Sequence, residues 1–388
     1  MDFALTEEQK MIEDMCRRFA EKEIKPVAAR LDETREHPQQ LCEQMGELGL
    51  MGITVPEKYG GAGMDYVSYI VALIEISKGC ASTGVIMSVN NSLYCFPINY
   101  FGTEAQKETY LTPVASGNAI GCYALTEAGA GSDPASMRTT ATLEGDQWVI
   151  RGEKKFITNG NVADYCVVAA VTDKEKGSKG ISSFILDVKN TPGFSVGRVE
   201  DKLGIKASGT AELVFNEARI PKENLLGQEG AGLRQMLTTL DAGRLGIGAQ
   251  AVGIGRAVLE EAASYANTRE QFGRSIGKFQ AIQWKLADMA TELDAAELLL
   301  LRAAWLQDAG KPFEKESAMA KMYASDVAMR AAVEGVQILG GYGYCKDFPM
   351  ERHMRDAKIC QIYEGTNEIM RLVIARNLFK EMRSQDGP

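Results

Sequence analysis

Histidine is nearly absent from this sequence of 388 residues, which contains only His37 and His353. This scarcity disfavours a metal site built from several histidines, and we predict no metal centre. It also leaves a serine-histidine-aspartate site only two choices of base. Long apolar runs are missing as well. No stretch of eighteen consecutive apolar residues occurs, and we therefore predict no membrane insertion.

The N-terminus lacks the features of a secretory signal. It begins Met-Asp-Phe-Ala-Leu-Thr-Glu-Glu-Gln, with neither a basic region nor an apolar region. A presequence that had already been removed would leave no trace in the mature chain. We therefore expect a cytoplasmic location in a bacterium, or the mitochondrial matrix if a presequence was removed.

Paired cysteine motifs are also missing. The eight cysteines include no Cys-x-x-Cys pair, and most lie among apolar residues. Their even number leaves disulfides open, but a chain of this length does not need them, and buried reduced thiols fit better. The charge balance is acidic, with 43 Lys and Arg against 52 Asp and Glu and a net charge of −9. This sign disfavours nucleic acid and anionic membranes as partners, because neither attracts an acidic protein.

The common nucleotide-binding fingerprints do not occur. Gly253-Ile-Gly255 lacks the third glycine of a dinucleotide turn and lies inside a helical pattern with no preceding strand. Glycines in this context are more typical of close helix packing. No Walker A sequence is present either, so the sequence predicts neither a Rossmann turn nor a P-loop.

Three segments of the chain differ in periodicity, and the length predicts two or three domains. Residues 1–120 follow helical spacing, with Thr6 and Gln9 as a capping box. Residues 121–230 contain short β-rich runs separated by turn signals, which predict an antiparallel sheet or small barrel. Residues 231–388 return to long helical patterns, which predict an antiparallel four-helix bundle. The predicted fold class is α+β, mainly α.

Two segments in the β region have both a structural and a functional interpretation. Between Tyr123 and Asp133, Gly129 and Gly131 would let backbone N–H groups approach a pyrophosphate, although a plain surface turn is the simpler interpretation. In Phe156-Ile-Thr-Asn-Gly160, the Asn-Gly pair is a strong hairpin signal. The aromatic ring and the threonine hydroxyl could instead pack on and bond a planar ligand.

Two charged turns in the helical region are similarly open. Tyr363-Glu-Gly-Thr-Asn-Glu368 follows a strand-like run at Ile359–Ile362 and precedes a helical pattern. Glu364 is either a solvated carboxylate near a helix start or a general base whose pKa is raised by apolar surroundings. Arg269-Glu-Gln-Phe-Gly273 joins two long helices, and Arg269 either caps a helix or pairs with a phosphate or diphosphate.

Taken together, these segments resemble the acyl-CoA dehydrogenase family in their order, spacing and residue identities over essentially the whole chain. Thr126-Glu-Ala-Gly-Ala-Gly-Ser-Asp133 is similar to the first family signature. Gln337-Ile-Leu-Gly-Gly-Tyr-Gly343 and Ile362-Tyr-Glu-Gly-Thr366 are similar to the second. The segments Ser82–Tyr94 and Asp201–Ile205 most resemble the short-chain, butyryl-CoA members.

The resemblance implies FAD and an acyl-CoA substrate, which is dehydrogenated between its α- and β-carbons to the trans-2-enoyl-CoA. The charge that develops on the thioester oxygen would be stabilised by the backbone N–H of Glu364 and a ribityl hydroxyl of FAD. Family members carry their base at one of two positions, which are Glu364 and Gly243 in this chain. Glycine cannot accept a proton, so Glu364 is the predicted base.

The same resemblance assigns the ligand contacts. Flavin contacts are Tyr123, Leu125, Thr126, Ser132, Phe156, Ile157, Thr158, Thr366 and Glu368, the last of which is Gln in many members. Contacts with the adenosine diphosphate end, some of them across a subunit interface, are Arg269, Gln271, Phe272, Gln280, Gln337 and Gly341. Contacts with the acyl-CoA are Ser132, Ser178, Asp241, Arg244 and Gly365.

The resemblance further implies a homotetramer that passes electrons to an electron-transferring flavoprotein. Glutaryl-CoA members carry an Arg where this chain has Val85, and a substrate carboxylate buried there would lack a partner. Branched-chain or cyclic substrates and an oxidase that uses O₂ are alternatives with the same mechanism. A non-catalytic relative that serves as an assembly or binding subunit is an alternative of another class.

Overall fold

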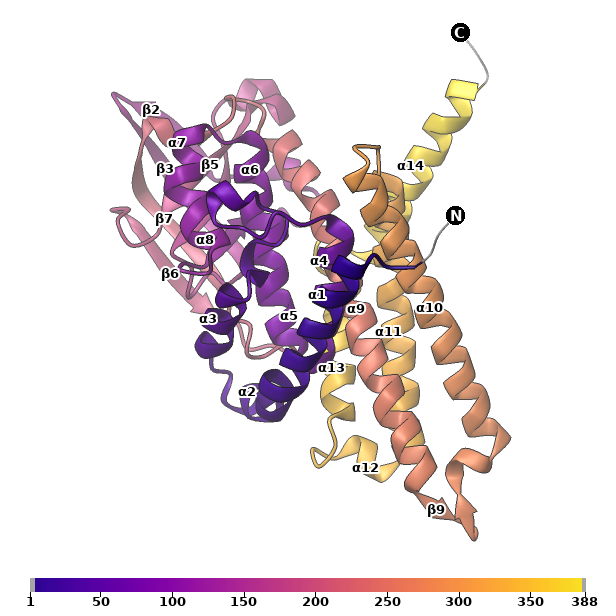
Figure 1. Cartoon of the computed structure of the whole chain (residues 1–388). Helices are drawn as coiled ribbons and strands as arrows, with labels where there is room; N and C mark the ends of the chain where they lie inside the picture. The colour runs from indigo at the N-terminus through magenta and orange to yellow at the C-terminus, as the bar shows by residue number, and fades with distance from the viewer. Residues whose placement is uncertain (1–3, 386–388) are drawn as a thin grey trace.

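The computed structural model describes residues 4–385 as N-terminal helices, a central sheet and a C-terminal set of long helices (Figure 1). This architecture confirms the predicted α+β, mainly α class. The N-terminal helices lie between the sheet and the long C-terminal helices, so all three parts meet in the middle of the molecule. No helix within the described range is both long and apolar enough to cross a membrane.

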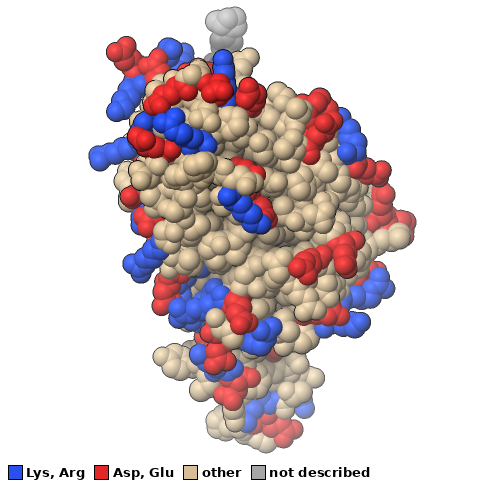
Figure 2. Space-filling model, turned by 90° about the vertical axis from the view of Figure 1, so that its left-hand side faces the viewer, with Lys and Arg blue, Asp and Glu red and all other residues tan. Residues whose placement is uncertain are grey.

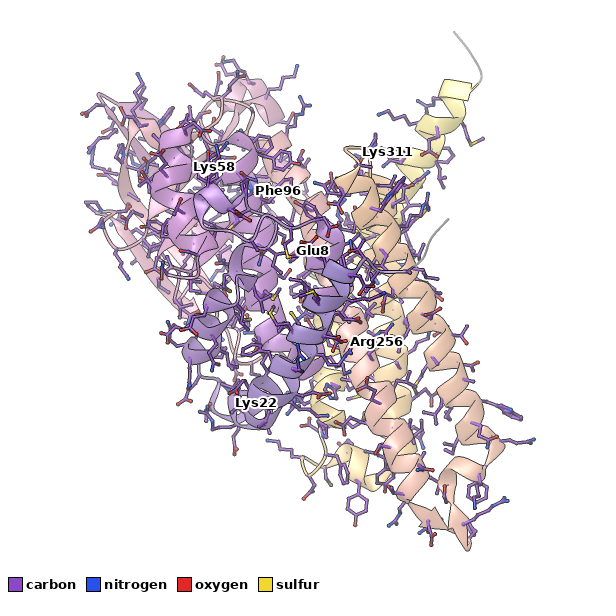
Figure 3. All side chains as sticks on the ribbon, viewed as in Figure 1. Glu8, Lys22, Lys58, Phe96, Arg256 and Lys311 are labelled. Atoms are coloured by element: carbon purple, nitrogen blue, oxygen red, sulfur yellow. The ribbon has the colours of Figure 1, made fainter. Side chains whose placement is uncertain are left out.

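The N-terminal part is organised around two almost completely buried helices, α4 and α5. Helix α1 begins at the predicted capping box, in which Thr6 and Gln9 exchange side chain to backbone hydrogen bonds. Phe96, labelled in Figure 3, is buried at the start of α6 and stacks on Tyr100. The helices of this part are α1 (Glu7–Phe19), α2 (Ala28–Thr34), α3 (Gln39–Glu47), α4 (Tyr66–Gly79), α5 (Ala81–Ser88), α6 (Phe96–Phe101), α7 (Glu104–Gln106) and α8 (Thr112–Ala115).

The central sheet has the strand order β6-β7-β3-β2-β4-β5-β8, with β1 beside β4. It is mainly antiparallel, as predicted, but β1 runs parallel to β4, and β2 touches β4 in parallel at one residue pair. β1 pairs with residues 165–168 of β4, β2 meets β4 at Val171, and the antiparallel hairpin of β2 and β3 separates β1 from β4 in the chain, so no crossover helix is needed. The strands are β1 (Gly121–Ala124), β2 (Thr140–Glu144), β3 (Gln147–Thr158), β4 (Tyr165–Val171), β5 (Ile181–Asp187), β6 (Phe194–Val199), β7 (Thr210–Pro221) and β8 (Leu225–Leu226).

The C-terminal part packs long helices side by side, with α9 and α11 at its centre. Gly253 and Gly255 lie in the middle of α9, where the structure supports the packing interpretation. A Cβ added at Gly253 would lie 2.5 Å from a carbonyl oxygen of α4. Arg256, also labelled in Figure 3, joins α9 to α10 through Glu297. The helices are α9 (Gly232–Thr268), α10 (Gln280–Asp308), α11 (Glu314–Leu339), α12 (Gly341–Tyr344), α13 (Met350–Cys360) and α14 (Asn367–Gln385).

One local prediction in this part was wrong. The strand-like run Ile359–Ile362 belongs to the end of α13 and the turn after it, because the buried face of α13 repeats at helical spacing through His353, Asp356, Ala357 and Cys360. The segment 269–273 joins α9 to α10 as predicted, with Arg269 at the C-cap of α9, and it forms a small hairpin of β9 (Glu270–Gln271) and β10 (Arg274–Ser275). Its turn residues Phe272 and Gly273 both have positive φ, at 52° and 74°, which is the geometry of a two-residue hairpin.

Charges of both signs are mixed on the surface. On the face shown in Figure 2, acidic and basic side chains alternate around a broad area without charges, and neither sign forms a continuous field. All eight cysteines are free, and only Cys345 is exposed.

Candidate active site

Glu364 occupies a strained turn between α13 and α14. Its φ is 52°, and that of Gly365 is 96°, so two successive residues take left-handed conformations. A non-glycine residue adopts this conformation only where the surroundings enforce it, and such residues concentrate at functional sites. The turn directs the carboxylate at α9, where a Cβ added to Gly243 would lie 2.1 Å from Oε2 of Glu364. Glycine at position 243 therefore makes the space that the carboxylate occupies.

The environment of this carboxylate favours its protonated form. Oε2 of Glu364 is inaccessible to solvent and has no hydrogen-bond partner among the described residues. Burial raises the pKa of Glu364 to about 8, although the positive charges of Lys321 and Arg244 oppose the shift. A carboxyl group with a pKa in this range can take up a proton near neutral pH, which is the requirement for a general base.

The turn is fastened to α11 by a buried polar cluster. Lys321 is completely buried, and its Nζ donates to the carbonyl oxygen of Gly365 at 2.7 Å and to Oδ1 of Asn367 at 3.0 Å. Nδ2 of Asn367 donates in turn to Ser325 and to Asp326, at 2.9 and 2.8 Å. Sequence reasoning missed Lys321. A signal was present, because this lysine stands among small residues in Ser-Ala-Met-Ala-Lys-Met-Tyr-Ala-Ser, a pattern typical of a buried helix face.

A second group of residues closes the space beyond Glu364. The face of α9 that begins at Gly243 continues at Gly246, where an added Cβ would lie 2.2 Å from the Ser88 hydroxyl and 2.6 Å from that of Tyr69. One turn further, Gln250 is completely buried and accepts a hydrogen bond from the hydroxyl of Tyr363. Buried polar side chains therefore lie within two turns of α9 from the carboxylate.

The predicted flavin contacts of the sheet domain lie on neighbouring segments. Tyr123 and Leu125 are buried at the end of β1, and Thr126 accepts a hydrogen bond through its carbonyl from the backbone of Lys155, at 2.8 Å. Ser132 lies in the exposed loop after β1. Phe156 is 62% exposed with a φ of 60°, next to the buried Ile157, and Thr158 ends β3.

A buried ion pair supports these segments and was also missed. Lys154 on β3 is completely buried, with Nζ 2.8 Å from Oε1 of Glu127 and 3.0 Å from the carbonyl oxygen of Leu125. Glu127 also accepts hydrogen bonds from the backbone of Arg138 and of Thr139. The pair thus joins β3 to both ends of the glycine-containing loop. Glu127 stands inside the quoted signature, but the sequence did not show that its partner is Lys154.

The predicted adenosine-end contacts gather elsewhere. Arg269, Gln271 and Phe272 lie on the hairpin at the far end of α9, next to α12 (Figure 1). The guanidinium of Arg269 lies 5.7 Å from the ring centre of Tyr342 in α12. Arg269 follows Arg244 by 25 residues, or about 37 Å of helix. Gln280, Gln337 and Gly341 lie at the start of α10, in the last turn of α11 and in α12, respectively. Within one chain, these adenosine-end residues therefore lie at the far end of the helical bundle, apart from the predicted flavin contacts on β1 and β3.

The predicted substrate contacts are divided as well. Arg244 is 5% exposed and pairs with Asp241, and its Nε has no partner within the described part of the chain. Burial raises the pKa of Asp241 to about 6, against the effect of Arg244. Gly365 follows the base directly, whereas Ser178 lies in the exposed segment Lys174–Gly180. Thr366 and Glu368 open α14 on the other side of the turn.

These residues fit a flavin cofactor and an acidic ligand. Added Cβ atoms at Gly129 and Gly131 would meet nothing within 4 Å, so this loop offers free backbone to a ligand. Phe156 presents an exposed ring beside it, and the unpartnered atoms of Glu364 and Arg244 point to groups that come from outside the chain. Helical and β domains that enclose a buried, unpartnered carboxylate, with an exposed aromatic ring beside a glycine loop, are typical of an enzyme that binds a cofactor.

Comparisons with known proteins agree with this class. The N-terminal, middle and C-terminal domains of acyl-CoA dehydrogenase match residues 6–118, 122–218 and 230–379, respectively. A short-chain specific acyl-CoA dehydrogenase of Clostridium acetobutylicum is 51% identical over 98% of this chain and 100% of its own length. The butyryl-CoA dehydrogenase structure from Megasphaera elsdenii has a TM-score of 0.96 at 46% identity, covering 98% and 100% of the two chains.

A second solved structure has the same TM-score. It comes from work on the electron transferring flavoprotein of Acidaminococcus fermentans and has a TM-score of 0.96 at 52% identity, covering 97% of this chain and 99% of that one. The chain belongs to the acyl-CoA dehydrogenase family. It is an enzyme of acyl-CoA dehydrogenation, and its cofactor is FAD.

Proposed function

We propose that this chain dehydrogenates short-chain acyl-CoA substrates, with Glu364 as the base that removes the α-proton. One observation carries the proposal. Oε2 of Glu364 is buried, lacks a hydrogen-bond partner among the described residues and lies against Gly243 of α9, in the space that the absent side chain leaves. A base in this position would accept a proton from an atom lying between the turn and α9.

The residues divide the work between proton removal and charge stabilisation. The pair of electrons from the broken α-C–H bond develops negative charge on the thioester oxygen, and the backbone N–H of Glu364 would stabilise it. Gly365 would allow the substrate to approach this backbone closely. Bound FAD supplies the acceptor for the β-hydride. Arg244 would hold the CoA moiety, with Asp241 fixing its guanidinium.

The walls beyond Glu364 support a short acyl chain. Tyr69, Ser88 and Gln250 bring buried polar groups to within one or two helical turns of the base. A long alkyl chain would have to displace these groups or leave them without partners, which costs free energy. Branched-chain or cyclic substrates remain the second candidate, because the same base and cofactor would serve them.

The position of the cofactor residues supports an oligomer. The flavin set would hold the ring through Thr126, Phe156 and Thr158, while the adenosine set lies at the far end of α9. A second copy of the chain would have to supply one of the two sets. We therefore extend the proposal to a homotetramer with electron-transferring flavoprotein as the electron acceptor. The compartment, bacterial cytoplasm or mitochondrial matrix, stays a prediction.

The test measures flavin reduction in the purified FAD-loaded protein. Butyryl-CoA should bleach the wild-type flavin, and Glu364→Gln should slow this bleaching about 10³-fold, within the range of a lost general base. Glu381→Gln, an exposed change on α14, is the matched control and should bleach normally. A bleaching rate near wild type in Glu364→Gln would overturn the assignment of the base.

The substrate assignment needs a separate panel. Steady-state kcat/KM with butyryl-, octanoyl-, isovaleryl- and cyclohexanoyl-CoA should be highest for butyryl-CoA. Each substrate is assayed with electron-transferring flavoprotein and, separately, with O₂ alone. Turnover supported by O₂ alone would identify an oxidase, and a preference for isovaleryl- or cyclohexanoyl-CoA would favour the second candidate.

A further inference from the structure

We infer that Lys321 is a positioning residue of the reaction proposed above, whose ammonium group fixes the catalytic turn and supplies a buried positive charge that favours Glu364 as a carboxylate. This inference rests on the proposed function. It adds a residue on α11 that touches neither the turn's carboxylate directly nor the α-carbon. Lys321 would act through the backbone of the turn and through its electric field.

The geometric part of the argument starts from the strain in the turn. Glu364 and Gly365 both have positive φ values, and this conformation needs support from outside the turn. Nζ of Lys321 donates to the carbonyl oxygen of Gly365 at 2.7 Å, on the C-terminal side of the strained pair. It also donates to Oδ1 of Asn367 at 3.0 Å, at the first residue of α14. One ammonium group thus joins the strained turn to the helix that follows it.

The electrostatic part follows from the partners of this ammonium group. Both acceptors are neutral oxygens, and no carboxylate within residues 4–385 forms an ion pair with Lys321 at 4.0 Å or less. No carboxylate of the described residues contacts the ammonium directly, and Asp326, which acts on Lys321 from a distance, is itself paired with Arg371 and accepts a hydrogen bond from Asn367. In a buried site such a charge acts on its neighbours over several ångströms, and Glu364 is the carboxyl group of the strained turn that it holds.

Other groups contribute to the field at Glu364 and have to be considered with Lys321. They are Arg244 of α9, which also favours the carboxylate, and the hydroxyls of Tyr69, Tyr123 and Tyr363, whereas the thiol of Cys360 faces Lys321 itself. The hydroxyls and the thiol are neutral near pH 7, since burial raises the pKa of Cys360 to about 12 and that of each tyrosine above its ordinary value. Burial lowers the pKa of Lys321 to about 8, which leaves its ammonium mainly charged at neutral pH. Lys321 and Arg244 are therefore the two cations that act on the base.

A purely structural lysine would also hold the turn, so the experiment separates the two roles. Lys321→Met removes both the hydrogen bonds and the charge. Lys321→Gln removes the charge and keeps an N–H donor that can reach toward Gly365. Lys315→Met on the same helix, where Lys315 pairs with Glu381 near the surface, is the matched control. FAD content and thermal melting show that each holoenzyme is folded.

The measured quantity is the rate of flavin reduction by butyryl-CoA as a function of pH. We expect Lys321→Met to lower the limiting rate 10- to 100-fold, with KM changed less than threefold. The acid limb is the fall in rate on the low-pH side of the profile. In Lys321→Met it should shift upward by about one pH unit, because loss of the nearby cation raises the pKa of Glu364. Lys321→Gln should recover part of the rate but retain the shifted limb, and Lys315→Met should match the wild type.

The outcomes distinguish failure of this inference from failure of the proposed function. If the wild type does not bleach, or if Glu364→Gln bleaches at the normal rate, the proposed function itself fails. If Glu364→Gln is inactive while both Lys321 variants keep the wild-type limb, only the inference is overturned, and Lys321 is structural. Should Lys321→Met not fold, the pH profile of Lys321→Gln alone decides between these results.

Discussion

Two lysines are completely buried within residues 4–385, and their surroundings differ in one respect. Lys154 in the sheet domain lies 2.8 Å from a carboxylate oxygen of Glu127, which itself takes two backbone hydrogen bonds. Lys321 in the helical bundle binds only neutral oxygens, those of Gly365 and Asn367. Burial lowers the pKa of both lysines. The same residue type in the same state of burial therefore meets two different electrostatic environments.

The difference distinguishes a lysine that is held in an ion pair from one that is bound only to neutral oxygens. In the sheet domain the charge of Lys154 is cancelled locally, and it holds the pKa of Glu127 below its usual range although burial alone would raise it. Such a pair fastens segments together and projects little field. In the bundle, no carboxylate of the described residues pairs with Lys321, and we propose that its charge acts on the carboxylate of the neighbouring turn. The first lysine fastens a loop to a strand, whereas the second is proposed to favour the ionised form of the base.

The largest expected effect is the loss of stability when Lys154 of the sheet domain is removed from its ion pair. Lys154→Met would leave the Glu127 carboxylate buried without its cation, at a cost of about 3–5 kcal/mol. Thermal melting of the FAD-loaded protein should fall by roughly 5–10 °C. The double variant Lys154→Met/Glu127→Gln removes both charges and should recover much of the loss. A single variant that melts like the wild type would show that this ion pair contributes nothing to the fold.

The next effect is the pH dependence of kcat/KM, which should not depend on the Lys154–Glu127 pair. Because burial raises the pKa of Glu364 to about 8, the base is protonated at lower pH and cannot accept the α-proton. The value of kcat/KM for butyryl-CoA should therefore fall about tenfold for each pH unit below about 7. The Lys154→Met/Glu127→Gln variant should keep this limb in place, since it removes one positive and one negative charge together and neither group acts on Glu364. An acid limb near pH 4.5 would show that the carboxyl is not perturbed.

The sequence predicted those features that depend on short-range patterns. The capping box at Thr6, the long helices after residue 230 and the turn that carries Glu364 all depend on residues close in the chain. The two buried lysines could not be predicted in this way. Lys154 meets Glu127 from 27 positions away, and Lys321 meets Gly365 from 44 positions away, so only the fold brings these partners together.

The features that the sequence prediction missed have related causes. The charged residues of α13 hide a helical repeat of buried positions, and the run Ile359–Ile362 therefore resembles a strand. The hairpin at Phe272 depends on positive φ values at two residues, and only one of them is glycine. The parallel pairing of β1 with β4 joins strands that are separated in the chain by β2 and β3, and periodicity does not record such a pairing. Local patterns gave the elements, and longer-range geometry determined how they pair.

The smallest expected effect is on kcat in Gly243→Ala, which would move the proposed base while leaving Lys321 in place. In Gly243→Ala the new Cβ would lie 2.1 Å from Oε2 of Glu364 and 2.7 Å from Cδ2 of Leu93, so the carboxylate has to shift. Small displacements of a catalytic group are costly, and we expect kcat to fall about tenfold. The acid limb should move little, because the lysine and its field are unchanged.

The control is a second alanine on the same helix. In Gly255→Ala the added Cβ would meet Cδ2 of Leu293 at 2.4 Å, the far end of a flexible side chain. Overpacking there should lower the melting temperature and leave kcat unchanged. If both variants lost activity equally, the effect would come from general distortion of α9. A loss confined to Gly243→Ala, at an unshifted limb, would show that the position of the carboxylate and the charge that acts on it are set by different residues: the first by the glycine on α9, the second by the lysine on α11.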